Sequence, residues 1–134
     1  MKPFVLDSSM TTMSGVFYPT GHIFLMYPSL DAARDAAKRL TDGGIGVDDM
    51  SLLTPELIQE KITRTVGNAD IPLPSAGTEA DTVRIFADLA SDGHHGVLVH
   101  APKGADGDRV MELLKDSGFS TAKKYRQLVI EDME

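Results

Sequence analysis

Two short segments of the chain, residues 23–27 and 97–101, are apolar at nearly every position, which is the pattern of strands covered on both faces. Each segment is followed by a stretch in which apolar residues recur at helical spacing, and a glycine follows each stretch. The pattern therefore predicts a strand and then a helix, twice. The apolar stripes are Ala32, Ala33, Ala36, Ala37 and Leu40 in the first helix and Val110, Met111, Leu113 and Leu114 in the second.

The two strand-helix segments are also related in sequence. Residues 23–45 align without a gap on residues 97–119, and further strands are expected within residues 49–54 and 123–131. Two strand-helix-strand units in succession predict an α+β fold, the ferredoxin-like βαββαβ plait, built from two pseudo-repeats. The identical aligned pairs are Pro28 and Pro102, Leu40 and Leu114, Asp42 and Asp116, and Gly44 and Gly118.

The plait prediction assigns positions in the sheet. Segments 23–27 and 97–101 are expected to be parallel neighbours at the sheet centre, related by a pseudo-twofold axis. Because the alignment pairs His100 with Met26 and strand side chains alternate, His100 is expected to share a sheet face with Phe24 and Met26. The basic residues at the start of the last strand are typical of a solvent-exposed edge, and these are Lys123, Lys124 and Arg126.

Between the two units lies a helical insertion, residues 55–92, that a simple plait does not need. Thr54 followed by Pro55 is a helix start, and Leu57, Ile58, Ile62 and Val66 form its apolar stripe. Residues 68–77 are interpreted as a proline-containing linker. Thr78 is predicted to cap a second helix with the stripe Val83, Phe86, Leu89 and Ala90.

The N-terminal residues 1–21 show no sustained period and are expected to form a loosely held extension. The length of 134 residues and the apolar content of 42% fit a single domain over residues 1–134. In a plait the helices cover one sheet face, yet large apolar side chains fall on both. We therefore expect the second face to be covered by the insertion or, as we favour here, by a second copy in a homodimer.

Charge and composition narrow the partners. The net charge of −7 disfavours nucleic acid and anionic membrane surfaces, and the central strands offer few aromatic side chains for base stacking. The chain has no cysteine, so no disulfide or thiolate chemistry is expected. No apolar run has the length of a signal peptide or a membrane span, and a cytoplasmic location is expected. No cofactor is indicated.

The histidines are the most conspicuous candidates for chemistry. His94, His95 and His100 fall within seven residues, and His22 precedes the matching strand of the first repeat. Neutral imidazole binds zinc, copper or nickel, so these residues form a candidate ligand-binding or metal site whose metal is unknown. Tyr125 is a possible proton donor if the last strand brings it near. The alternative is structural: His94 and His95 bond the turn, and His100 lies satisfied on the sheet.

The segment PKGADGD, residues 102–108, is glycine-rich but lacks the Gly-Lys-Ser/Thr ending of a nucleotide-binding loop. Asp106 and Asp108 lack the other ligands of a calcium loop. They are interpreted as complementing the dipole at the start of the second helix.

Several of these motifs together resemble a known family. An Ala-rich helix that ends in DGG, the strand DDMSLLT, a helical insertion, the segment GHHGVLVHAP and a helix that ends in DSGF resemble the small bacterial general-stress or heat-induced-stress domain. The resemblance covers roughly residues 16–132 and implies a ferredoxin-like core, a cytoplasmic bacterial protein, an association with stress and no established enzymatic activity. The short polar middle segment departs from the glycine-rich, hydrophobic one common in that family, which argues against a membrane-directed role.

The sequence contains no motif for a particular reaction, and whether the protein is an enzyme stays open. The favoured hypothesis is a non-catalytic stress-associated module that acts by self-association or by binding a protein or small ligand. The alternative is a His-based metal- or ligand-binding protein, or a small enzyme, that uses His94, His95 and His100.

Overall fold

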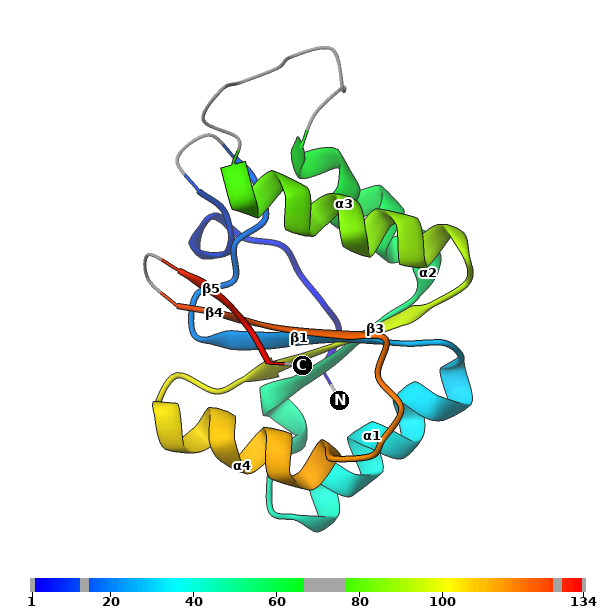
Figure 1. Cartoon of the computed structure of the whole chain (residues 1–134), viewed down its shortest axis with the longest axis vertical. Helices are drawn as coiled ribbons and strands as arrows, with labels where there is room; N and C mark the ends of the chain where they lie inside the picture. Colours follow the sequence, from blue (N-terminus) through cyan, green and yellow to red (C-terminus); the bar gives the residue numbers. More distant parts are fainter. Residues whose placement is uncertain (1, 13–14, 67–76, 127–128, 134) are drawn as a thin grey trace.

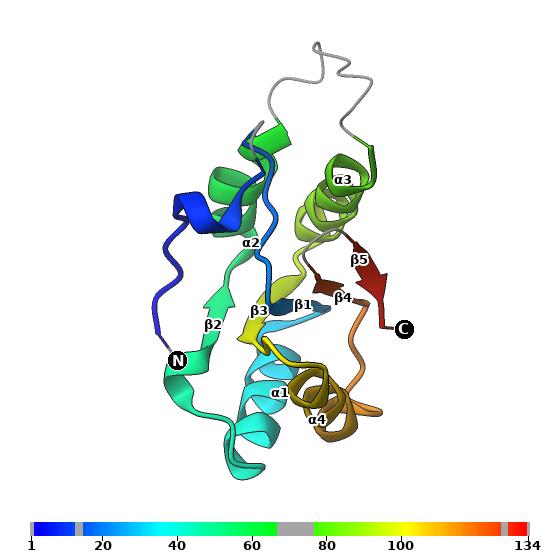
Figure 2. The same ribbon diagram turned by 90° about the vertical axis from the view of Figure 1, so that its left-hand side faces the viewer.

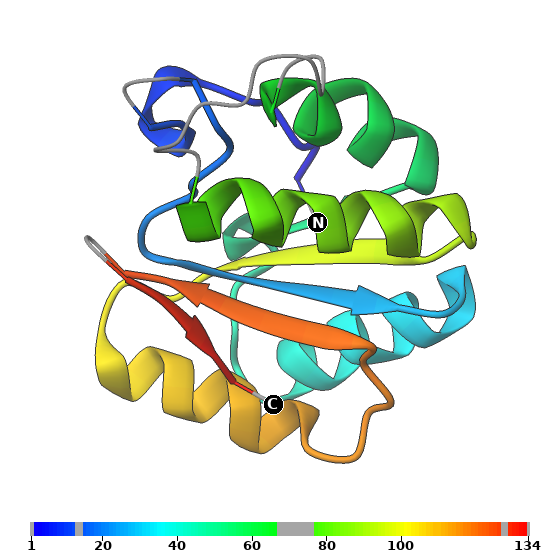
Figure 3. The ribbon, with the colours of Figure 1, turned by 45° about the horizontal axis from the view of Figure 1, so that its top comes forward.

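The computed structural model of the chain describes residues 2–12, 15–66, 77–126 and 129–133. Its centre is a five-stranded antiparallel sheet with the strand order β2-β3-β1-β4-β5. Helices α1 and α4 lie on one face of the sheet, while α2, α3 and the N-terminal segment lie on the other (Figure 1, Figure 3). The predicted α+β class is confirmed. The strands are β1 (His22–Tyr27), β2 (Met50–Leu53), β3 (His95–His100), β4 (Thr121–Tyr125) and β5 (Ile130–Asp132).

The helices begin where the sequence places capping residues. The Ser29 hydroxyl accepts a hydrogen bond from the Ala32 amide at 3.1 Å, and Thr54 accepts one from the Leu57 amide at 3.1 Å. Residues 68–76 of the predicted linker 68–77 and the side chain of Thr78 lie outside the described residues, and Gly77 is the first residue of α3. The helical elements are α1 (Leu30–Asp42), α2 (Pro55–Leu57), which continues as η3 (Ile58–Ile62) and η4 (Thr63–Val66), α3 (Gly77–Ser91) and α4 (Gly104–Leu114), with short 3₁₀ turns η1 (Ser8–Met10) and η2 (Val47–Asp49).

The predicted stripes of α1 and α4 form the first core. Leu40 and Leu114 are fully buried against side chains from the middle strands, and Met111 and Leu113 pack at the margin. Alanines at three of the buried α1 positions allow the helix to lie close to the sheet. This core contains Ile23, Leu25, Tyr27, Val97, Val99 and Ala101 from β1 and β3, with Ala33, Ala36, Ala37 and Val110 from the helices.

The two repeat strands are central neighbours, but the predicted parallel direction is wrong. β1 and β3 pair antiparallel, with Phe24 opposite Leu98. A twofold axis perpendicular to a sheet reverses the strand on which it acts, so two repeats related in this way must run in opposite directions. The helix α1 returns the chain to β2, two positions away from β1, and β3 fills the gap between them antiparallel to both.

The predicted solvent-exposed edge at Lys123 and Lys124 is also wrong. β4 pairs with β1 on one side and with β5 on the other, so β5 forms that edge of the sheet. Lys124 is only 5% exposed, and the Lys123 ammonium lies 3.2 Å from a carboxylate oxygen of Asp132 on β5. The sequence pattern joined β4 and the short strand β5 into one strand and therefore placed the edge of the sheet at β4.

The second sheet face is covered by the chain itself. Phe24, Met26 and Leu98 on this face are at most 3% exposed, and they pack against the insertion and the N-terminal segment. The apolar patch that motivated a homodimer through this face is therefore absent from the described surface of the single chain. Buried residues of the covering layer are Val16, Phe17, Ile58, Ile62, Val83, Phe86 and Ala90.

The N-terminal segment is not a loose extension over its described part. The Lys2 amide donates to the Met50 carbonyl at 3.0 Å, so the chain begins along the free edge of β2 (Figure 2). It then crosses the second sheet face, where the fully buried Phe17 ring meets Phe24 and Tyr125 edge to face, each at a centroid distance of 5.9 Å. The segment thus supplies aromatic core side chains that a helix stripe alone does not provide.

The substitution Phe17→Ala tests this role. We expect it to lower the free energy of unfolding by about 3 to 5 kcal/mol, because it removes a fully buried aromatic ring and leaves a cavity. Urea denaturation measures the change. Val5→Ala is the control, because Val5 is 68% exposed and the change should stay within about 0.5 kcal/mol. Equal, small effects of both substitutions would show that the segment is not part of the core.

Candidate functional site

The strand register places four polar side chains in one row at an end of the sheet. His22 on β1 lies opposite His100 on β3. The same register continues to Asp49, which precedes β2, and on the other side to Tyr125 of β4. Cross-strand neighbours point to the same face, so the row lies on the face that carries Phe24 and Met26. The prediction that His100 shares this face is confirmed.

The His22 and His100 rings form the centre of the row. Their centroids are 4.9 Å apart, and Nδ1 of His22 lies 3.1 Å from the Thr20 carbonyl oxygen. Burial lowers the pKa of His22; the bond to Thr20 opposes this change, and the positive charges of His100 and Lys2 add to it. Nδ1 of His100 lies 3.7 Å from the Asp49 carboxylate, and both side chains are about half exposed. The row therefore has one partly buried imidazole and one exposed imidazole in contact.

His94 and His95 lie at the opposite end of β3 and do not join this row. Nδ1 of His94 lies 2.7 Å from the Ser120 hydroxyl, which donates to the Met26 carbonyl, so the ring nitrogen is the donor of that bond. Nδ1 of His95 lies 3.2 Å from the Gly93 carbonyl oxygen. Five residues of extended strand, about 16 Å, separate His95 from His100. The three histidines that the sequence grouped are thus not brought together.

A metal centre is not assembled from the side chains that the structure describes. Within residues 2–12, 15–66, 77–126 and 129–133, no group of three or more His, Cys, Asp or Glu side chains is arranged to hold a metal ion. His95 bonds the turn between α3 and β3, as the structural alternative expected, whereas His94 bonds Ser120 just before β4.

Tyr125 is a core residue rather than an accessible proton donor. Its ring is fully buried between Phe17 and Tyr18, at centroid distances of 5.9 and 4.9 Å. Burial raises its pKa, and the neighbouring Tyr18 raises it further. Its hydroxyl has no hydrogen-bond partner in the described part of the chain. Such a group holds its proton at physiological pH.

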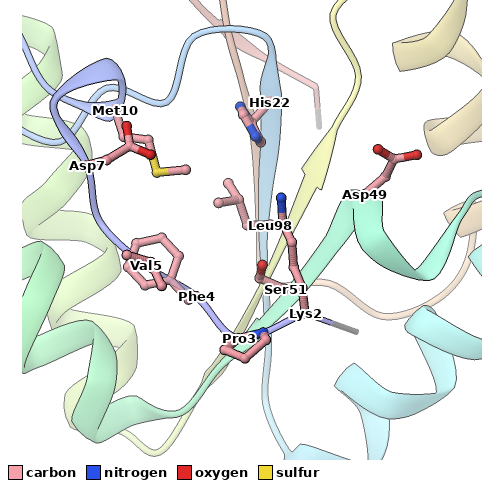
Figure 4. A pocket seen from close by; sticks show the side chains of 10 residues that line it. All are labelled: Lys2, Pro3, Phe4, Val5, Asp7, Met10, His22, Asp49, Ser51 and Leu98. Atoms are coloured by element: carbon pink, nitrogen blue, oxygen red, sulfur yellow. The ribbon is translucent and has the colours of Figure 1, made fainter.

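A pocket of about 200 Å³ opens beside the histidine row (Figure 4). We call it the N-terminal pocket, because residues within 2–10 form its outer wall. Its floor comes from the sheet, and Lys2 extends from the outer wall toward Leu98 and His22 on that floor (Figure 4). The floor residues are His22, Asp49, Ser51 and Leu98.

Charges of both signs line the N-terminal pocket. Lys2 supplies an ammonium, and Asp7 supplies a carboxylate that accepts hydrogen bonds from the Ser9 hydroxyl and the Ser9 amide. These two bonds lower the pKa of Asp7, so it stays ionised. Phe4 and Leu98 contribute apolar surface between the charged groups. The arrangement can hold a small molecule that has both polar and apolar parts.

Sequence reasoning missed most of this pocket. Lys2 and Asp7 belong to no motif, and Asp49 and Ser51 lie in the segment DDMSLLT, which predicted only a strand. The single available signal was His22, which the repeat placed just before the first central strand. Its partner across the sheet depends on the register, which the sequence pattern did not determine.

Comparison with family models, with curated proteins and with solved structures finds no match to this chain. Among the described helices, none is long and apolar enough to cross a membrane. The function is therefore argued from the geometry of the pocket.

The substitution Tyr125→Phe tests the isolated hydroxyl. We expect it to raise the free energy of unfolding by about 1 to 3 kcal/mol, because it removes a buried polar group that lacks a partner. Tyr27→Phe is the control, since the Tyr27 hydroxyl lies 2.8 Å from the Ser117 hydroxyl and its loss should destabilise. Urea denaturation compares the two variants. A larger loss of stability for Tyr125→Phe than for Tyr27→Phe would contradict this account.

The lowered pKa of His22 predicts a pH dependence of stability. An unfolded histidine titrates near 6.5, and folded His22 titrates below that value. Between the two pKa values the unfolded chain binds a proton that the folded chain does not, so stability is full above about pH 6.5 and falls as the pH is lowered.

We expect His22→Asn to remove this component of the pH dependence, while His95→Asn at the other end of β3 retains it. Urea denaturation at a series of values between about pH 7.5 and pH 5 measures the slope. An identical slope for the unsubstituted protein and both variants would show that His22 titrates alike in the folded and unfolded chain.

Proposed function

We propose that this protein is a non-catalytic, stress-associated binding module that takes an amino-acid-sized zwitterion in the N-terminal pocket. The observation that carries the proposal is the pocket itself, in which Lys2, Asp7 and the partly buried His22 surround a cavity of about 200 Å³. The stress association rests on the sequence resemblance to the general-stress type of domain.

A ferredoxin-like core is part of the proposal. In the strand order β2-β3-β1-β4, the first strands of the two units, β1 and β3, lie next to each other. The second strands, β2 and β4, flank them, and α1 and α4 cover the same face (Figure 3). This arrangement supports a βαββαβ plait to which β5, the insertion and the N-terminal segment are added. In that view the pocket lies on the face that the plait helices leave free.

The size and charge of the pocket indicate the ligand. Its volume is smaller than the roughly 300 to 1,000 Å³ of pockets for drug-sized ligands, so the ligand has few atoms. A carboxylate of the ligand would meet Lys2, and an ammonium would meet Asp7 or Asp49. Phe4, Met10 and Leu98 offer a surface for a short apolar side chain.

The other functional hypotheses have less support. A site that uses His94, His95 and His100 would need histidines from both ends of β3 to act on one molecule. A homodimer through the second sheet face would need the insertion and the N-terminal segment to move away, because they bury that face. No step of a reaction is proposed, since the pocket presents no nucleophile within hydrogen-bond reach of a base among the described side chains.

Titration with free amino acids, followed through backbone amide NMR shifts, tests the proposal. Glycine, alanine, leucine and glutamate are the probes, and we expect at least one to bind with a dissociation constant in the millimolar range. The shifted amides should lie within residues 2–10 and 49–51 and at His22 and Leu98.

The substitution Lys2→Met should weaken this binding by about tenfold, since it removes the ammonium that meets the carboxylate. Lys38→Met is the control, because Lys38 lies exposed on α1 and pairs with Asp42. Absence of shifts with all four amino acids, or equal binding by both variants, would refute the proposal.

A further inference from the structure

A second cavity of about 320 Å³ lies at the same end of the sheet, on the side of α1 and α4. It is formed by the residues just before β1, by the segment between β3 and the start of α4, and by the end of β4. We call it the Lys124 cavity. Its lining includes Thr20, Gly21, Pro102, Gly104, Lys124 and Arg126.

The lysine of this cavity is buried without a counter-charge. Lys124 is 5% exposed, and its side chain projects from β4 on the face that carries Ile23. Within the described ranges its ammonium makes a single hydrogen bond, to the Lys103 carbonyl oxygen at 3.3 Å, and no ion pair. Lysine is almost never buried unless it is paired, because taking an ammonium out of water is costly. The structure around Lys124 thus lacks an anion.

The ammonium of Lys124 also lies beside the start of a helix. Lys103 precedes the first turn of α4, where the helix dipole is positive and the first amides have no intrahelical acceptor. Asp106, the acidic residue of that turn, accepts a hydrogen bond from the Lys103 amide at 3.1 Å. It therefore complements the helix dipole, as the sequence predicted, but it forms no ion pair with Lys124.

The helix itself is adapted to the lysine. Gly107 lies in the buried side of α4, and a Cβ atom there would lie 2.4 Å from Nζ of Lys124. Glycine within a helix is less favourable than alanine. The chain thus combines a helix-weakening residue with an uncompensated buried charge, and neither favours stability. Local choices that oppose stability are expected at functional sites.

We infer that the Lys124 cavity binds the phosphate group of a small phosphorylated molecule. Lys124 and the free amides at the start of α4 would hold the phosphate oxygens, as helix N-termini do for anions. Arg126 lines the cavity, and its guanidinium, now 3.2 Å from a Glu131 carboxylate oxygen, is available at the rim.

The geometry favours a phosphate monoester over other anions. Two cationic side chains and a helix N-terminus match a dianion better than a carboxylate. The cavity leaves room for a few atoms beyond the phosphate, and the net charge of −7 repels larger polyanions. The site is separate from the N-terminal pocket, since Lys124 and His22 project from opposite faces of the sheet. Ligand binding at one site can therefore be disproved without affecting the proposal for the other.

Titration with inorganic phosphate and with glycerol phosphate at constant ionic strength tests the inference. We expect amide shifts at residues 20–21, 103–107 and 124–126, and a rise in stability with ligand concentration as binding to the folded state requires. Tighter binding of one of the two probes identifies free phosphate or a phosphate monoester as the source. Acetate is the control anion, and we expect it to leave these amides unshifted.

The substitution Lys124→Met should abolish the shifts, or weaken binding by about tenfold or more. It should leave the protein at least as stable as the unsubstituted one in phosphate-free buffer, because it replaces an unpaired buried charge by an apolar chain of similar length. Lys115→Met, an exposed lysine that follows α4, is the matched control and keeps the binding.

A second variant keeps the inference testable if Lys124→Met does not fold. Gly107→Ala forces the ammonium away from its position while it favours the helix, so phosphate binding should weaken with the fold retained. The inference is overturned if neither phosphate probe shifts the amides of the Lys124 cavity, if acetate binds equally well, or if the variant at position 124 binds like the one at position 115.

Discussion

The antiparallel pairing of β1 with β3 determines most of the other features of this structure. It places Phe24 opposite Leu98 and His22 opposite His100, so one register assigns every side chain of the two central strands to a face. A shift by one residue would exchange the side chains of the two faces. The side-chain volumes oppose such a shift. Gly96 has no side chain, and a Cβ there would lie 2.6 Å from the Phe24 ring, so the ring occupies the space that this glycine leaves.

The second sheet face explains the structural role of the insertion and of the N-terminal segment. Helices α1 and α4 cover one face of the sheet, and the large apolar side chains on the other face also require a cover. The insertion provides α3 and the turns after α2, while the N-terminal segment provides Phe17. At the sheet end the cover is incomplete, because His22 is only partly buried and the His100 side chain is 44% exposed. The N-terminal pocket is thus a consequence of how far the covering segments extend.

The two cavities differ in how polar groups are balanced. In the N-terminal pocket, Lys2 and Asp7 supply opposite charges, and Asp7 is stabilised by hydrogen bonds to Ser9. In the Lys124 cavity, a buried ammonium faces the positive end of α4 with a carbonyl oxygen as its partner. Burial of charge without a counter-ion is the less stable arrangement. This contrast is the reason that a phosphate, rather than a zwitterion, is assigned to the Lys124 cavity.

The amino-acid sequence alone determined the local structure. Ser29, Thr54 and the stripes that include Leu40 and Leu114 were sufficient to locate helix starts and buried helix faces, because these signals act over a few residues. The repeat placed β1 and β3 at the sheet centre, and alternation placed His100 on the correct face.

Strand direction, the separation of His95 from His100 and the cover of the second face depended on tertiary structure. The burial of Lys124 also depended on tertiary structure. Its basic cluster predicted a solvent-exposed edge strand, but β5 pairs with β4 and forms the edge instead. Contacts between residues far apart in the chain decide these features, because register and burial depend on which strands and helices pack together. Short-range sequence patterns do not specify those contacts.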